Sequence, residues 1–240
     1  MLRTLSDSVL SVIYPQECRA CGEEVEFAND GVSCPTCWSS TKIFLGDETL
    51  CNKCGAFLFG GRLSGSAICR KCDDHSYDHV LSIGLYEKAL AATIIELKKT
   101  PHFSGTARRL LAEALDRSIL GNTDVVIPVP LSPRRLHERG FNQAAIIGRE
   151  VAEHLGVAID ESTLIRKVHT PMHRAGMDKK ARAITVKNAF GVVRPNLVEN
   201  KRVLLVDDIF TSGETASNCA KVLKMSGAST VNVLTIARAA

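Results

Sequence analysis

Residues 203–215 read VLLVDDIFTSGET, and this stretch decides how the larger part of the chain folds. Its four leading apolar residues predict a buried strand. Asp207 and Asp208 follow at the carboxyl end of that strand, the edge where open α/β sheets place ligands. Residues 211–215 form a small hydroxyl-rich turn that opens a helix, an arrangement suited to a phosphate group. The carboxylates suit sugar hydroxyls or a divalent ion. The stretch therefore predicts a sugar phosphate site, with an ordinary N-capped helix as the alternative.

Strands and helices alternate on both sides of this stretch. The sequence predicts strands over residues 80–86, 124–130, 163–168, 201–206 and 230–237, and helices over residues 88–99, 104–120, 141–155 and 215–225. Such alternation predicts a parallel sheet with helices on both faces. Residues 168–188 lack periodicity and are rich in basic side chains, which is typical of a functional loop or a disordered segment.

Eight of the nine cysteines form four Cys-x-x-Cys pairs in the first third of the chain. The pairs are Cys18 and Cys21, Cys34 and Cys37, Cys51 and Cys54, and Cys69 and Cys72. Two pairs can supply four thiolates to one tetrahedral ion, so the sequence predicts two zinc ribbons whose full ligand sets indicate structural zinc. Short loops favour sequential pairing, although the spacing leaves a cross-braced arrangement open. A disulfide framework is the weaker alternative because it requires an exported protein. The ninth cysteine, Cys219, is interpreted as a buried core residue.

Composition and charge exclude several classes of protein. The chain has 240 residues, 45% of them apolar, with 30 Lys and Arg against 26 Asp and Glu, so it is neither a disordered chain nor a polycation. No run approaches the roughly 18 apolar residues of a membrane span. Without a convincing signal peptide, the clustered thiols predict a cytoplasmic protein.

Charge also divides the chain into two parts. Residues 1–76 carry a net charge of −3 and residues 77–240 carry +7. We predict a double zinc ribbon with a short N-terminal helix over residues 1–76 and an anion-binding domain over residues 77–240.

The strand, the acidic pair and the turn resemble the phosphoribosyl pyrophosphate signature of type I phosphoribosyltransferases. In that family the acidic pair holds the ribose hydroxyls and the turn holds the 5′-phosphate. The resemblance implies ribose contacts for Asp207 and Asp208. It implies a phosphate cradle made of Thr211, Ser212, Gly213, Glu214 and Thr215. A type I phosphoribosyltransferase-like domain that binds Mg²⁺ together with phosphoribosyl pyrophosphate is the expected fold and ligand set.

Three further motifs point to one family within this wider group. They are PVP at residues 128–130, RGFNQ at residues 139–143 and KNAF at residues 187–190. In this order, and after cysteine ribbons, they resemble the competence protein F family, including its double-ribbon members, over nearly the whole chain. The resemblance implies a link to competence, DNA uptake or the use of DNA as nutrient. It also aligns residues 168–188 with the mobile flap of the wider superfamily.

The same resemblance aligns the segment after PVP with the pyrophosphate loop. The candidates for pyrophosphate contacts are Arg134, Arg135 and Arg139, whose guanidinium forks match phosphate oxygens. The alternative for each arginine is a solvated position on a helix face. In the flap, Ile184, Thr185 and His173 depart from the usual family pattern.

Three functions are compatible with these residues. The first is a phosphoribosyltransferase that displaces pyrophosphate from the ligand with a nitrogen nucleophile. The second is a non-catalytic DNA-uptake adaptor that binds single-stranded DNA; the net charge of +7 favours it, whereas the scarcity of aromatics disfavours base stacking. The third is a regulator that senses phosphoribosyl pyrophosphate. The acidic ribbon segment suits a protein partner, for which the resemblance implies DNA-uptake proteins. No motif identifies an acceptor base or a catalytic residue.

Overall fold

The computed structural model describes residues 16–25, 31–58, 68–69, 72, 74–167 and 189–239. The predicted N-terminal helix and the whole predicted flap lie outside the described residues. In chain order the strands are β1 (Gln16–Glu17), β2 (Glu24–Val25), β3 (Val80–Leu85), β4 (Val125–Pro128), β5 (Ala158–Ile159), β6 (Leu164–Arg166), β7 (Phe190–Val192), β8 (Arg202–Phe210) and β9 (Thr230–Arg238). The helices are α2 (Pro35–Ser39), α3 (Lys88–Leu97), α4 (Gly105–Asp116), α5 (Pro133–Arg139), α6 (Gln143–Leu155) and α8 (Glu214–Met225), with short 3-10 turns η3 (Ile119–Gly121) and η4 (Pro195–Leu197).

Five strands form one parallel sheet in the order β3-β9-β8-β4-β5, which confirms the predicted α/β class. The central strand β8 pairs with β4 on one side and β9 on the other. It extends to Phe210, beyond the end predicted at residue 206, because Asp207 still pairs with Thr235 of β9. The two carboxylates therefore lie within the last part of the strand instead of after it.

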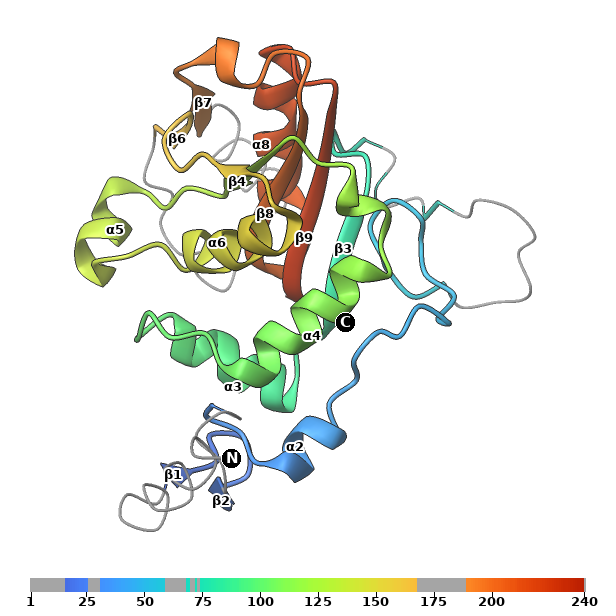
Figure 1. Cartoon of the computed structure of the whole chain (residues 1–240), viewed down its shortest axis with the longest axis vertical. Helices are drawn as coiled ribbons and strands as arrows, with labels where there is room; N and C mark the ends of the chain where they lie inside the picture. Colours follow the sequence, from blue (N-terminus) through green and yellow to red (C-terminus); the bar gives the residue numbers. More distant parts are fainter. Residues whose placement is uncertain are drawn as a thin grey trace, which may run out of the picture.

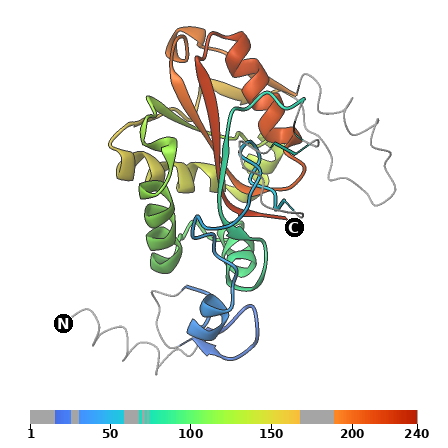
Figure 2. The same cartoon turned by 90° about the vertical axis from the view of Figure 1, so that its right-hand side faces the viewer.

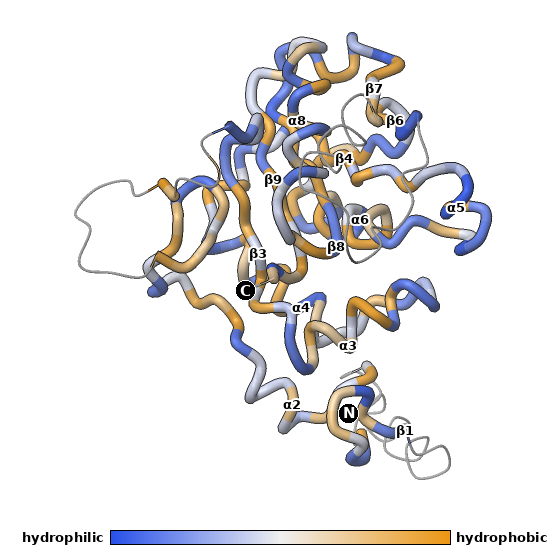
Figure 3. Tube along the Cα trace, turned by 180° about the vertical axis from the view of Figure 1, so that it is seen from behind, coloured by the Kyte–Doolittle hydropathy of each residue, from blue (hydrophilic) through white to orange (hydrophobic). Residues whose placement is uncertain are grey.

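Helices cover both faces of the sheet and create two separate cores. Leu204 and Val206 of β8 pack in a core with α3, α4 and α6, whereas Val203 and Leu205 pack in a core with α8. Figure 2 shows α4 and α6 on one side of the sheet and α8 on the other. The strands β3, β8 and β9 are hydrophobic along most of their length, while α5 stands out as hydrophilic (Figure 3). The sheet is therefore buried on both faces, as expected for parallel strands.

Some elements differ from the predicted pattern. The helix predicted to reach residue 120 ends at Asp116, because the Ser118 hydroxyl accepts a hydrogen bond from the Leu120 amide and starts η3. The strand predicted over residues 163–168 is β6, which pairs antiparallel with β7 outside the main sheet. Helix α5 and strands β5 and β7 are additional to the predicted elements. None of the described helices is both long enough and apolar enough to cross a membrane.

The two cysteine regions take different positions on the α/β domain. The first region, with β1, β2 and α2, lies beside α3 at the end of the molecule marked N in Figure 1. Residues 42–44 then run along the edge of β3, where Phe44 donates its amide hydrogen to the Ile83 carbonyl and Ile43 bridges Gly84. The second cysteine region comes next along the chain and packs with the α8 core. The chain therefore crosses the open edge of the sheet between the two regions.

Candidate functional site

The eight predicted zinc ligands gather into two clusters. Cys18, Cys21, Cys34 and Cys37 form the first cluster, and Cys51, Cys54, Cys69 and Cys72 form the second. Within each cluster all four sulfur atoms lie within 4.8 Å of one another. The prediction of sequential pairing is confirmed, and the cross-braced arrangement is excluded.

The sulfur spacing fits zinc and not disulfides. A tetrahedral ion with Zn–S bonds of about 2.3 Å separates its sulfurs by about 3.8 Å. The Cys21 and Cys34 sulfurs are 3.7 Å apart, and those of Cys54 and Cys69 are 3.5 Å apart. A disulfide would need about 2.05 Å, and all nine cysteines are free thiols. The full sets of four thiolates leave no open position for a substrate, which indicates structural zinc.

Backbone amides prepare one thiolate in each cluster for the metal. Burial raises the pKa of Cys18, but hydrogen bonds from backbone amides, the strongest from Cys34, outweigh it and lower that pKa to about 6. The Cys34 amide nitrogen lies 3.3 Å from the Cys18 sulfur. In the second cluster burial likewise raises the pKa of Cys51, and amides led by that of Cys54 lower it to about 6. Each cluster can therefore hold one thiolate at neutral pH, and a bound cation would favour the others.

The acidic pair lies at the C-terminal part of β8 with its two carboxyl groups in different surroundings. Successive residues of a strand point to opposite faces. The Asp208 side chain is 6% exposed, and Lys98, at the end of α3, places its ammonium 2.8 Å from the Asp208 carboxylate. The nearby charge of Asp208 also favours the charged form of Arg139, whose pKa burial lowers. Asp208 thus belongs to the face covered by α3 and α6.

Asp207 belongs to the opposite face. Its charge acts on Arg166 and on the buried thiol of Cys219, which lies on α8. Burial, followed by the charge of Asp208, raises the pKa of Asp207 well above its usual range. The Asp208 backbone amide donates to the Asp207 carboxylate at 2.9 Å and opposes that rise. The position of Cys219, fully buried within the α8 core, confirms its prediction as a core residue.

The predicted phosphate turn lies between β8 and α8. Gly213 is the N-cap of α8 and has a left-handed backbone with φ of 79°. The side chain of Ser212 is exposed and accepts a hydrogen bond from the Glu214 amide at 3.4 Å. Thr211 and Glu214 are exposed and Thr215 is half-buried. The turn therefore presents hydroxyls and the first amides of a twelve-residue helix at the surface beside the acidic pair.

The three predicted pyrophosphate arginines lie on α5, but they differ in environment. The Arg134 side chain is 70% exposed and pairs with Glu138 on its own helix at 2.7 Å. Arg139 is half-buried and bonded to the Gln143 side chain, while the charge of Arg135 acts on both Arg139 and Arg166. The fold thus places Arg139 within reach of the charge of Asp208 and Arg135 near Arg139 and Arg166, and it holds Arg134 on the outer face of α5.

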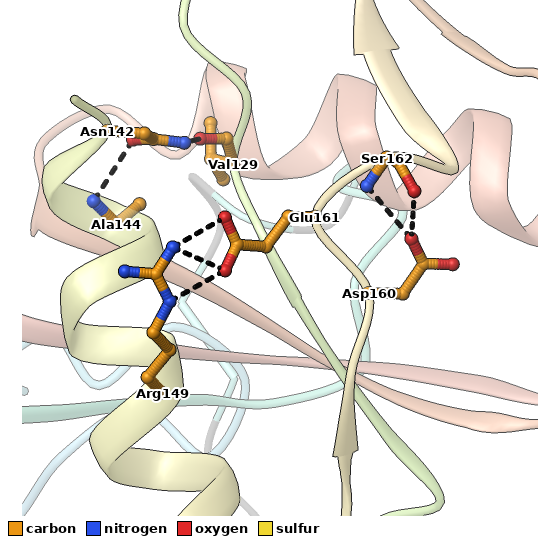
Figure 4. Close-up of polar contacts among 7 residues, drawn as sticks. All are labelled: Val129, Asn142, Ala144, Arg149, Asp160, Glu161 and Ser162. Atoms are coloured by element: carbon orange, nitrogen blue, oxygen red, sulfur yellow. Dashed lines mark hydrogen bonds and ion pairs between the residues drawn. The ribbon is translucent and has the colours of Figure 1, made fainter. Parts of the chain in front are cut away.

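Asn142 of the RGFNQ motif fixes the start of α6 to the end of β4. Its side-chain amide donates to the Val129 carbonyl at 3.0 Å, and its side-chain oxygen accepts from the Ala144 amide at 3.1 Å. Figure 4 shows these two bonds beside the Arg149–Glu161 pair, which ties α6 to the segment after β5. The motif therefore fixes the connection between α5, which ends at Arg139, and α6.

Four residues near the site carry no motif signal. Arg166 comes from β6 and lies over the Phe190 ring, with 5.3 Å between the guanidinium carbon and the ring centroid. His75 and Tyr77, which come after the second cysteine cluster, pack against Gly213. Lys98 is recognisable in the sequence only as a cation at the end of a helix pattern.

The comparisons with known proteins agree with this architecture. The family model described as Double zinc ribbon domain matches residues 9–73. Competence protein F of Haemophilus influenzae is 31% identical over 92% of this chain and 96% of that protein. DNA utilization protein YhgH of Salmonella typhi is 32% identical over 79% of this chain and 84% of that protein. Competence protein ComFC of Bacillus subtilis is 26% identical over 84% of this chain and 89% of that protein.

A solved structure, the glutamine phosphoribosylpyrophosphate amidotransferase from B. subtilis complexed with ADP and GMP, aligns with 56% of this chain and 28% of its own, with 24% identity and a TM-score of 0.37.

Fold and clusters define a class of protein in which a double zinc ribbon precedes an α/β domain with a five-stranded parallel sheet. Within that class, the similarity to the Haemophilus influenzae protein over nearly both whole chains assigns the family. The chain belongs to the competence protein F family.

Proposed function

We propose that this protein binds phosphoribosyl pyrophosphate together with Mg²⁺ at the C-terminal part of β8 and serves the uptake or use of DNA. The observation that carries the proposal is the pair Asp207 and Asp208 directly before the turn of residues 211–215. Carboxylates alone would repel a phosphate. Carboxylates beside a turn that presents hydroxyls and the first amides of a helix at the surface suit a ligand that carries hydroxyls next to its phosphate.

The charges around the acidic pair support a ligand with more than one phosphate. Lys98 and Arg139 flank Asp208, and Arg166 flanks Asp207. Three cations near two carboxylates leave an excess of positive charge that a pyrophosphate group can neutralise. Mg²⁺ bound with the ligand would screen the remaining phosphate charge, and the ligand itself would supply most of its oxygens.

In the proposed complex the side chains of this chain have separate tasks. The carboxylates accept hydrogen bonds from ribose hydroxyls and orient the sugar ring. The amides and hydroxyls of residues 211–215 hold the 5′-phosphate, and Arg135 and Arg139 contact the pyrophosphate. Catalysis, where it occurs, would rest on positioning and on stabilising charge on the departing pyrophosphate.

Titration calorimetry with phosphoribosyl pyrophosphate and Mg²⁺ tests the site. The double variant Asp207→Asn, Asp208→Asn keeps the shape of both side chains and removes their charge. Each charged hydrogen bond to the ligand contributes about 1.5–3 kcal/mol. Because the double variant loses one at each position, its affinity for phosphoribosyl pyrophosphate should be at least about 100-fold lower. Asp116→Asn is the matched control, because Asp116 is exposed and pairs with His154. Equal affinity in the double variant and the wild type would refute the site assignment.

Release of pyrophosphate, screened across purine and pyrimidine bases, separates a transferase from a protein that only binds or senses the ligand. Turnover with one base identifies the acceptor and makes the protein a phosphoribosyltransferase. Tight binding without release from any base supports the adaptor or the sensor instead.

Single-stranded DNA is the second ligand that we propose. The relatives carry the words competence and DNA utilization in their names, and residues 77–240 of this chain carry a net charge of +7. Electrostatic binding to several phosphates predicts an affinity that falls steeply with salt, with a log–log slope of about −0.7 for each phosphate contacted. A flat salt series would remove DNA from the list of ligands.

A further inference from the structure

We propose that residues 74–78, the segment that leaves the second zinc cluster, form a positioning wall for the phosphate turn. Through this wall, the second ribbon holds residues 211–215 in the conformation that binds a 5′-phosphate. The identity of the ligand rests on the function proposed above, whereas the wall rests on packing alone.

The wall closes tightly on Gly213. A β-carbon built on this glycine would lie 2.9 Å from the Cε1 atom of His75, 2.9 Å from the Tyr77 hydroxyl oxygen and 2.8 Å from the Cζ atom of Phe210. Real β-carbons do not approach heavy atoms closer than about 3.0 Å, so these three side chains fill the space that a side chain at position 213 would need. The left-handed turn is thus covered on one side by the strand that precedes it and by the segment from the ribbon.

Hydrogen bonds fix the same segment to helix α8. The Ser76 amide donates to the Ser217 hydroxyl at 3.0 Å, one turn into the helix. The Tyr77 hydroxyl and the Nδ1 atom of His75 are hydrogen-bonded at 2.5 Å, which holds both side chains in place over Gly213. Tyr77 is 1% exposed and packs edge-on against Phe210, with ring centroids 5.9 Å apart. The turn and the segment therefore form one packed unit.

The other end of the wall is tied to the second cluster. The His75 amide donates to the Cys72 carbonyl at 3.1 Å, and the Lys53 ammonium donates to the His75 carbonyl at 2.7 Å. Lys53 lies between the ligands Cys51 and Cys54, so both Cys-x-x-Cys turns of this cluster contact the segment. The conformation of the wall consequently depends on the fold that the metal stabilises.

A second connection reaches Phe210 from the sheet. Arg238, at the end of β9, donates to the Cys54 carbonyl at 2.6 Å within the protein interior. The same guanidinium lies over the Phe210 ring, 5.6 Å from its centroid. Phe210 in turn contacts the position of Gly213. The second ribbon therefore supports the turn by two routes, one through Tyr77 and one through Arg238.

A turn that binds phosphate through its own amides gains affinity when it is held in place before the ligand arrives. Within the turn the Glu214 amide donates to the Ser212 hydroxyl over 3.4 Å, which is a long hydrogen bond, so packing from neighbouring segments adds to what holds the turn in place. We therefore expect a selective effect when the wall is lost. The affinity for ligands that contact the turn should fall, whereas the affinity for ligands that contact only the arginines of α5 should not change.

The binding test compares two probes, ribose 5-phosphate and inorganic pyrophosphate, each with Mg²⁺, by calorimetry on the full chain. Tyr77→Ala should lower the affinity for ribose 5-phosphate about tenfold, or 1.4 kcal/mol, and should leave the affinity for pyrophosphate unchanged. Tyr77→Phe keeps the ring but removes the hydroxyl that is bonded to His75, so its affinity for ribose 5-phosphate should fall less than that of Tyr77→Ala, and its affinity for pyrophosphate should stay unchanged. Trp38→Ala removes a buried aromatic of the first ribbon and is the matched control. If Tyr77→Ala lowers the affinity for both probes equally, or lowers neither, the proposal that residues 74–78 position the phosphate turn is wrong.

Hydrogen exchange tests the wall without any ligand and so stands apart from the proposed function. In Tyr77→Ala the amides of residues 213–217 should exchange at least about tenfold faster, while those of α6 stay unchanged. Ser217→Ala removes only the hydrogen bond from the Ser76 amide, so it provides a second test if Tyr77→Ala does not fold. In Ser217→Ala the amides of Ser76 and of the turn should exchange faster than in the wild type. Unchanged exchange at residues 213–217 in a folded variant would refute the wall. If the wild type binds neither probe, the proposed ligand is wrong, but the hydrogen-exchange result still decides whether residues 74–78 position the turn.

Discussion

The two zinc ribbons repeat one motif, but they contact different parts of the α/β domain. Residues leaving the first cluster bond to the beginning of α3: the Thr41 hydroxyl accepts from the Ala89 amide at 3.1 Å, and the Ser40 carbonyl accepts from the Lys88 ammonium at 2.8 Å. The segment leaving the second cluster bonds to helix α8 through Ser76 and Ser217, and the cluster itself bonds to the end of β9 through the Cys54 carbonyl. Identical ligand sets therefore support different segments, and the residues that leave each cluster decide which segment it supports.

The difference continues through the sheet. The first ribbon belongs to the core of α3, α4 and α6, the face on which Lys98 meets Asp208. The second belongs to the core of α8, the face of Asp207 and Cys219. Each face of the sheet thus has its own ribbon and its own carboxylate. Variants on the two faces can be compared in pairs.

The largest difference is expected from loss of one ligand in each cluster. Cys54→Ser and Cys37→Ser replace buried cysteines, 5% and 7% exposed, and each should reduce the zinc content from two ions per chain to one. Only Cys54→Ser should weaken ribose 5-phosphate binding, by about 30-fold or 2 kcal/mol, because loss of the metal frees the turn whose Cys54 carbonyl accepts the hydrogen bond from Arg238. Metal analysis and calorimetry on the same samples measure both effects.

The wild type is the reference for both measurements. A zinc content near one in the unmodified protein would mean that one of the clusters does not bind metal. Equal loss of binding in the two variants would show that the ribbons support the domain in the same way, which contradicts the comparison.

Features that depend on short spacings could be predicted from the sequence. The sequential clusters follow from pairs separated by 12 and 14 residues, since short loops return the second pair to the first. The central strand and the helix after it follow from four apolar residues and a glycine turn. The predicted end of β8 is too early, because carboxylates are rare inside strands and only the pairing with β9 reveals that Asp207 continues the sheet.

Features that depend on distant segments could not be predicted. Lys98 and Asp208 are 110 positions apart and meet only because α3 ends over the C-terminal part of β8. Tyr77 stands at the predicted domain boundary, and its contact with Gly213 arises from the path of the chain across the sheet. The spacing of cysteines says nothing about that path. Arg134 shows the opposite case, because its place beside a motif predicts a pyrophosphate contact but its side chain lies on the exposed face of α5. The motif does not reveal which face of the helix a residue occupies.

A smaller effect is expected on the face of the first ribbon, from Lys98→Gln. The substitution leaves the Asp208 carboxylate buried beside an uncharged amide, whereas Lys99→Gln, the control, changes a neighbouring exposed lysine. Because the Lys98 side chain is 34% exposed, solvent screens part of the interaction, and we expect a loss of about 1–2 kcal/mol in the free energy of unfolding. Urea denaturation measures it. Equal stability of both variants would show that the ion pair contributes little.

The smallest effect is expected from Asp207→Asn and depends on pH. The pKa of Asp207 is raised in the folded protein, chiefly by burial, so the native carboxyl retains its proton at a pH where the unfolded chain has lost it. The stability that this group contributes is present below its ordinary pKa of about 3.9 and is lost as pH rises. Asparagine does not ionise, so Asp207→Asn should match the wild type near pH 4 and exceed it at pH 8, by an amount on the order of 1 kcal/mol.

The matched substitution on the other face should behave in the opposite way. Asp208→Asn leaves Lys98 without its partner carboxylate and should destabilise the protein at neutral pH. Unfolding in urea at pH 4, 6 and 8 measures both variants. If both destabilise the protein equally at every pH, the two carboxylates share one environment and the division of the site between the faces of β8 is wrong. If they diverge, Asp207 lowers the stability of the free protein at neutral pH, which is the behaviour expected of a group kept for its ligand and not for the fold.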